Sequence, residues 1–278
     1  MALAPSKHLG GLSMAANETH VDSLPKTGLL LIGMGLGRME GMTLEALEAA
    51  TRADHRRYEA YTALWPEAEL ARLEAKVGPI QRVMRPEVED PTELLELAAS
   101  SLVALLVVGD PLQATTHVDL QLRAAEAGVS CRVLHGVSIT TLVTGAVGLS
   151  NYKFGRQTTF TYPYGNWIAT SPLEVVASNW SQNLHSLVLL DLDPTGQGIG
   201  DQRPMTPADA VRSLGMMWHS MQTNEADGSA EDASATAFQR SMQTDFLEQS
   251  MEAMQVVLCS DMGLSLIHIS EPTRLESI

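Results

Sequence analysis

The chain has 278 residues, of which 45% are hydrophobic and 18% charged, an ordinary balance for a globular protein with one large domain or two modest ones. Acidic residues outnumber basic ones by 33 to 18, and the resulting net charge of -15 argues against a nucleic-acid binder, which needs basic surface. No apolar run is long enough to span a bilayer and the start lacks the apolar core of a signal peptide, so we expect a cytoplasmic protein without membrane contact.

The first predicted element is an aliphatic strand over 28–32. Residues 1–27 are polar and small without a clear period, and we expect a disordered extension or a misplaced start codon. The strand ends in the turn Gly33-Met34-Gly35-Leu36-Gly37, where glycines allow a ligand to approach backbone amides. Arg38 stands where the third glycine of a dinucleotide fingerprint belongs, so NAD is not indicated. A tight strand-to-helix turn without a ligand is the alternative.

The next elements alternate between helix and strand. A helix is predicted to follow Thr43, whose hydroxyl can cap it, and a strand is predicted around 58–61. Pro91-Thr92-Glu93 opens another helix. Residues 102–108 form a continuous run rich in Val and Leu, which is typical of a strand buried on both faces of a parallel sheet. This alternation favours an α/β domain.

Gly109-Asp110-Pro111 ends that run, at the position where an open α/β sheet usually binds ligands. The Asp110 carboxylate can accept hydrogen bonds from an ammonium group or a ribose hydroxyl, and a type I turn is an equally weighted alternative. A helix that begins near Thr116 and ends at Ala127, followed by a strand over 129–134, completes the predicted first half.

The second half is predicted to begin after Gly136 and to be α/β as well. Its expected helices lie at 138–149, 171–183 and from Thr206 onward, its expected strands at 158–162, 186–190 and 256–259, and an acidic loop at 223–236. Cys131 and Cys259 each lie in an apolar stretch, so we expect two buried thiols and no disulfide. The eight histidines show no paired metal spacing, and we expect no metal site.

No acid/base pair stands out as catalytic. We interpret His117 and His135 as structural, because a lone histidine is more often structural than catalytic. Tyr58, Glu59 and Tyr61 form either a polar cluster that faces a cleft or merely the end of a strand.

Several segments together resemble the diphthine synthase family, in the family's order and at nearly its spacing across 28–263. The most specific is Gly109-Asp110-Pro111 followed by Ala114-Thr115-Thr116-His117, a pairing that few other families share. The other segments are 31–36, 59–62, 135–139, 148–155, 162–167 and 184–191. Related tetrapyrrole methylases share the fold and the first glycine turn, but usually not the Tyr-Lys-Phe-Gly or Gly-Asn-Trp segments.

The resemblance implies two α/β domains, 28–136 and 137–263, which bind the methyl donor S-adenosylmethionine in the crevice between them, and it implies a homodimer. Donor contacts carried over from the family are Leu36, Asp110, Gln113, Ser138, Ile139 and Leu190, with Gln113 in place of a commoner apolar residue. The implied substrate is a histidine of elongation factor 2 that carries an aminocarboxypropyl group, whose amino nitrogen is methylated, three times in archaeal-type members. The alternatives are a tetrapyrrole (porphyrinoid) methyltransferase and a non-catalytic protein that binds S-adenosylmethionine.

The end of the chain departs from the family. There, the strand near 256–263 leads into a helix, a strand with a Pro-Leu-His-like motif and a closing Pro-Gly turn. Residues 264–278 instead resemble a translated adapter or vector sequence. We therefore expect a foreign tail, an incomplete second domain, and a chain that is poorly stable and weakly active, because missing strands expose a sheet edge. A genuine divergent terminus is the alternative.

Overall fold

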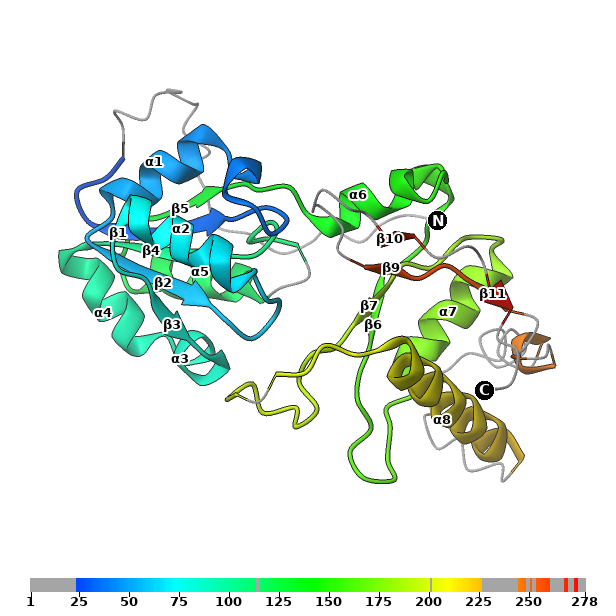
Figure 1. Cartoon of the computed structure of the whole chain (residues 1–278). Coiled ribbons are helices and arrows are strands. Elements are labelled where there is room, and N and C mark those ends of the chain that lie inside the picture. Colours follow the sequence, from blue (N-terminus) through cyan, green and yellow to red (C-terminus); the bar gives the residue numbers. More distant parts are fainter. Residues whose placement is uncertain are drawn as a thin grey trace, which may run out of the picture.

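The computed structural model describes residues 24–113, 116–200, 202–226, 245–248, 251, 254–260, 268–269 and 273–274. Figure 1 shows two α/β units side by side, joined by the segment that leads from β5 into α6. The expected extension up to residue 23, Ala114-Thr115 of the family motif, and the part of the expected acidic loop from residue 227 onward lie outside the described residues.

A parallel five-stranded sheet in the order β3-β2-β4-β1-β5 is the centre of the first unit. Its strands are β1 (Gly28–Gly33), β2 (His55–Glu59), β3 (Gln81–Val83), β4 (Leu102–Val107) and β5 (Cys131–Leu134). β1 and β4 pair in register from Gly28 opposite Leu102 to Gly33 opposite Val107, and every residue of both strands is buried. This burial explains why both strands read as continuous aliphatic runs.

Helices cover both faces of this sheet. They are α1 (Leu44–Arg52), α2 (Glu67–Val77), α3 (Arg85–Glu89), α4 (Thr92–Ser100) and α5 (His117–Glu126), with a 3-10 turn, η2 (Met39–Gly41), before α1. Leu30 of β1 belongs to the same hydrophobic cluster as residues of α1 and α2, whereas Leu31 packs with residues of α4 and α5. The predicted cap is confirmed, because the Thr43 hydroxyl oxygen accepts a hydrogen bond from the Ala46 amide at 3.0 Å.

The second unit has a smaller sheet. α6 (Ile139–Ala146), the 3-10 turn η3 (Asn151–Lys153), β6 (Thr158–Phe160), α7 (Ser171–Ser181), β7 (Val188–Leu190) and α8 (Pro207–Ala226) follow in order. β6 and β7 are parallel neighbours, and Phe160 of β6 packs in one hydrophobic cluster with Leu173 of α7, Met217 of α8 and Phe246. The expected strand and helix alternation therefore continues in this half.

Four predictions for the second half and the cysteines are corrected by the structure. The strand expected to be buried over 186–190 is the half-buried β7, because the described part of its sheet gives it one partner strand. The single strand over 256–259 is two short strands, β8 (Gln255–Val256) and β9 (Cys259–Ser260), which pair with β11 (Thr273–Arg274) and β10 (His268–Ile269). α8 continues to Ala226, beyond the predicted start of the acidic loop.

The two thiols are partly exposed and not buried as expected. Cys131 lies on the edge strand β5, and Cys259 lies on a strand of two residues, so neither is covered on all sides. Burial nevertheless raises the pKa of the Cys131 thiol to about 11, which keeps it in the unreactive protonated form. The foreign origin of 264–278 stays a prediction.

Candidate active site

Three glycines meet where β1, β4 and β5 end. A Cβ atom added to Gly136 would lie 2.2 Å from the carbonyl oxygen of Gly109 and 2.9 Å from the backbone of Gly33. Gly35 and Gly109 exchange backbone hydrogen bonds of 3.2 and 2.9 Å, and both have positive φ, +70° and +76°. The close backbone contacts at Gly33 and Gly136 leave no room for a side chain, and the positive φ of Gly35 and Gly109 favours glycine. The carboxyl edge of this sheet therefore presents bare backbone to a ligand.

The carboxylate of Asp110 ties two loops together at this edge. One oxygen accepts the Leu112 amide at 2.8 Å, and the other accepts His135 Nδ1 at 2.8 Å and the Gly136 amide at 3.2 Å. Asp110 is 7% exposed, whereas the His135 side chain is 69% exposed, so the carboxylate is buried but its histidine partner faces water. These hydrogen bonds connect the loop after β4 to the loop after β5, and the structural role of His135 stays a prediction. A direct contact between Asp110 and a ligand stays a prediction.

Polar groups at the start of α6 lie next to the loop after β4. The hydroxyl oxygen of Ser138 accepts the Thr140 amide at 3.3 Å and so caps α6. The Thr140 hydroxyl in turn donates to the side-chain carbonyl of Gln113 at 3.3 Å. The structure therefore brings the predicted residues Asp110, Gln113 and Ser138 to one place, although they are up to 28 residues apart in the chain.

The three apolar positions of the predicted donor set divide between the two units. Leu36 directly follows Gly35 and Ile139 is the first residue of α6, and both are half-buried. Leu190 is the last residue of β7 and is 38% exposed. A donor of the S-adenosylmethionine type needs apolar surface for its base and polar groups for its ribose and amino-acid end. These residues offer both kinds of surface at strand ends, which fits such a ligand.

The segment after β7 crosses from the second unit to the first. The Gly198 carbonyl accepts the backbone amide of Arg85 at 3.0 Å, and the Gln202 side chain donates to the carbonyl of Ala60. Ala60 directly follows β2, and Arg85 begins α3 shortly after β3. The carboxyl edge of the first sheet therefore faces the loop that leaves the carboxyl end of β7.

A buried ion pair lies beneath the loop after β4. Nε2 of His117 is 2.9 Å from the Glu59 carboxylate and Nδ1 is 3.0 Å from the Pro111 carbonyl oxygen; both side chains are 1% exposed. Burial opposes a charge on the imidazole, but the hydrogen bond and charge of Glu59, together with the Pro111 carbonyl, raise the pKa of His117 above 6.5. Both residues belong to segments that resemble the family, yet their pairing is invisible in the sequence because 57 residues separate them.

The residues that the structure describes include no helix with the length and hydrophobicity of a membrane span. They also contain no group of three or more His, Cys, Asp or Glu side chains that could hold a metal ion.

Residues 28–217 match the sequence profile of the family described as Tetrapyrrole (Corrin/Porphyrin) Methylases. A diphthine synthase from Methanoregula boonei is 37% identical over 191 residues, which are 68% of this chain and 74% of that relative. The chain belongs to the diphthine synthases. This family assignment confirms the α/β fold class and the class of reaction predicted from the sequence, which is methyl transfer from a donor of the S-adenosylmethionine type in diphthamide biosynthesis.

Other diphthine synthases are similar to the same part of the chain. The protein from Methanocorpusculum labreanum is 39% identical over 166 residues, 59% of this chain and 66% of its own length. A crystal structure of a diphthine synthase aligns with a TM-score of 0.60 and 34% identity, over 69% of this chain and 72% of that one. The chain thus spans about two thirds to three quarters of the length of these diphthine synthases. Their names favour the main prediction over a porphyrinoid methyltransferase.

Proposed function

We propose that the chain methylates the amino nitrogen of the aminocarboxypropyl-histidine of translation elongation factor 2, with S-adenosylmethionine as the donor. The observation that carries the proposal is the carboxyl edge of the first sheet. There the family motif at Gly109-Asp110-Pro111 meets the glycine turn after β1 and the cap of α6. The archaeal diphthine synthases among the relatives support the archaeal type, which methylates the same amino nitrogen repeatedly.

The proposed donor site consists of Leu36, Asp110, Gln113, Ser138, Ile139 and Leu190. Bare backbone at the strand ends lets a ligand approach amides and carbonyls closely, and Asp110 fixes the two loops that carry them. The Ser138 hydroxyl and the Gln113 amide supply polar contacts, while the exposed side of Leu190 supplies apolar surface from the second unit. A site that is assembled before binding loses less entropy when the ligand arrives.

The chemistry asks for orientation more than for acid or base. A bound donor supplies a sulfonium methyl group. The lone pair of the substrate amine forms the new C–N bond while the C–S bond breaks toward sulfur, and the resulting ammonium loses a proton to solvent before each further transfer. The chain's task is to align the amine with that methyl group and to exclude water, which half-buried apolar side chains such as Ile139 can do. This demand explains why the sequence shows no acid/base pair.

A homodimer and a cytoplasmic location are part of the same proposal. Both rest on the family resemblance, and the location also rests on the substrate, since elongation factor 2 acts where translation takes place. Light scattering of the purified chain tests the dimer, and a mass of one chain contradicts it.

The test of the function is direct. The chain is incubated with methyl-labelled S-adenosylmethionine and elongation factor 2 that carries the unmethylated aminocarboxypropyl group, and the modified peptide is analysed by mass spectrometry. We expect mass increments of whole methyl groups on the modified histidine. Absence of label on the factor, with label on a porphyrinogen offered in parallel, refutes the proposal.

A further inference from the structure

A small pocket lies beyond the carboxyl ends of β6 and β7 in the second unit. Its volume is about 180 Å³, and its walls include Tyr162, Pro194, Arg203, Asp209 and Arg212. Pockets for drug-sized ligands measure about 300–1,000 Å³, so this one suits a small group and not a porphyrinoid ring.

The pocket lies next to the carboxyl end of β7, where Leu190 is expected to contact the donor. Asp191 directly follows Leu190 of the proposed donor site, and its carboxylate accepts the Tyr162 amide at 3.4 Å. The Arg203 amide donates to the Leu192 carbonyl at 2.7 Å. Arg203 itself directly follows Gln202, whose side chain bonds to the carboxyl edge of the first sheet at Ala60. Residues of the pocket are therefore neighbours in the chain of Leu190 and of the residue that contacts the carboxyl edge of the first sheet.

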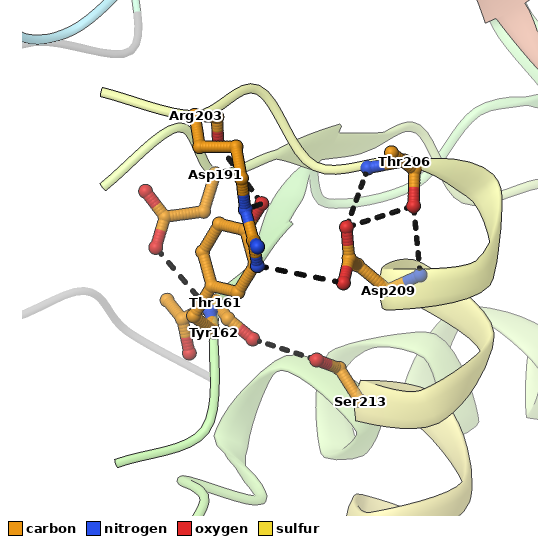
Figure 2. A network of polar contacts seen from close by, with 7 residues as sticks. All are labelled: Thr161, Tyr162, Asp191, Arg203, Thr206, Asp209 and Ser213. Carbon is orange, nitrogen blue, oxygen red and sulfur yellow. Dashed lines mark hydrogen bonds and ion pairs between the residues drawn. The ribbon is translucent and has the colours of Figure 1, made fainter. Parts of the chain in front are cut away.

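Two of the pocket's charged groups, Arg203 and Asp209, are held in defined positions, as Figure 2 shows. The Arg203 guanidinium lies over the ring of Tyr162, 5.1 Å from its centroid, and its Nη2 is 3.7 Å from Asp209. The hydroxyl of Tyr162 also donates a hydrogen bond to the Arg203 backbone carbonyl at 2.9 Å, so two contacts link these residues. The guanidinium is thus oriented by an aromatic face and keeps exposed N–H groups, since its side chain is 63% exposed.

Asp209, the acidic residue of the pocket wall, is also held by hydrogen bonds. The Asp209 carboxylate accepts the Thr206 hydroxyl at 2.7 Å and the Thr206 amide at 3.0 Å at the start of α8. These two hydrogen bonds lower the pKa of Asp209 most, and the charges of Arg203 and Arg212 lower it further. Asp209 is therefore ionised near neutral pH. Arg212 lies one turn further along α8. Two cations and one anion therefore meet at one pocket of a chain whose net charge is -15.

We propose that this pocket receives the carboxylate of the substrate's aminocarboxypropyl group, with Arg203 and Arg212 binding that carboxylate and Asp209 holding Arg203 in place, so that the amine is left free for the donor. The inference rests on the proposed function, because that function supplies the substrate. The carboxylate and the amine of an amino-acid group are attached to the same carbon, so charge-assisted hydrogen bonds to the carboxylate position the amine without engaging it. Guanidinium groups suit carboxylates because their fork of N–H donors matches the two oxygens.

Binding of elongation factor 2 tests the pocket separately from catalysis. Dissociation constants are measured for the factor with the unmethylated aminocarboxypropyl group and for the factor with unmodified histidine, together with the constant for S-adenosylmethionine. The variants are Arg203→Gln and Arg212→Gln. Arg156→Gln is the matched control, because Arg156 is an exposed arginine of the same unit outside the pocket.

We expect the chain to prefer the modified factor, and each pocket variant to lose about ten- to a hundred-fold of that preference, the usual effect of losing a charged hydrogen bond. The donor constant and the control stay as in the parent chain. If both pocket variants keep the full preference, the inference is wrong although the proposed function stands. If the parent chain neither distinguishes the two forms nor methylates the modified one, both are wrong.

Discussion

The replacement Gly136→Ala is the most direct perturbation of the site. The new methyl group would lie 2.2 Å from the Gly109 oxygen and 2.9 Å from the Gly33 backbone, and backbone atoms of two strand ends cannot rotate away as a side chain can. Gly136 has no positive φ, so the effect is steric alone. Overpacking typically costs about 1–3 kcal/mol, and rigid neighbours place this case near the upper end, about 3 kcal/mol.

Thermal unfolding measures this cost. For a chain of this size, each kcal/mol lowers Tm by about 2–4 °C, so we expect a decrease of roughly 6–12 °C, together with weaker binding of S-adenosylmethionine in calorimetry. Gly215→Ala is the control, since its added Cβ meets nothing within 4 Å in the middle of α8. Alanine is the better helix former, so this variant should gain about 0.5–1 kcal/mol. Equal Tm values for both variants would refute the packing argument.

Three further predictions concern the same edge and the assembly. Asp110→Ala should weaken donor binding by about 1–3 kcal/mol, since a charged acceptor of three hydrogen bonds is lost, and unchanged affinity in a folded variant contradicts its role. The raised pKa of His117 means that its pair with Glu59 contributes full stability below pH 6.5 and loses it as pH rises through the folded-state pKa. The stability advantage of the parent over His117→Gln in urea titrations should therefore shrink from pH 6 to pH 9, and a constant difference argues against it. In light scattering we expect the mass of two chains, and dilution that yields only single chains at micromolar concentration counts against the dimer.

The elements that the sequence predicts best are the strands that are buried on both faces. β1 and β4 were predicted because every side chain of such strands must be apolar, and the cap at Thr43 was predicted because its chemistry is local. α2, β3 and α3 were not among the predicted elements. β3 has three residues, two of them exposed, so it carries little periodic signal. The buried positions of α2, Leu70, Leu73 and Val77, do follow helical spacing, so that helix could have been predicted.

The place of Asp110 in the fold was predictable from the sequence, but its hydrogen bonds were not. Asp110 was singled out because it follows a buried strand, and the structure places it at the carboxyl edge of the sheet. Its bonds to His135 and Gly136 depend on β5 lying beside β1, which no local pattern specifies. The pocket at Arg203 and Asp209 was missed for the same reason, since its charged residues lie outside the segments that resemble the family.

The loop after β4 is held from two directions at consecutive residues. The Asp110 carboxylate connects it to the loop after β5, and the Pro111 carbonyl connects it through His117 to Glu59 at the end of β2. The loop position is therefore set by strands on either side of β4 and β1, before any ligand arrives. Because a site assembled in advance spends less binding free energy on ordering, removal of the buried anchor should weaken donor binding even though the anchor lies beneath the edge. We accordingly expect Glu59→Gln to raise the dissociation constant of S-adenosylmethionine while leaving the preference of the pocket for modified elongation factor 2 intact. A loss of that preference with donor affinity unchanged would show instead that Glu59 acts on the acceptor side of the crevice.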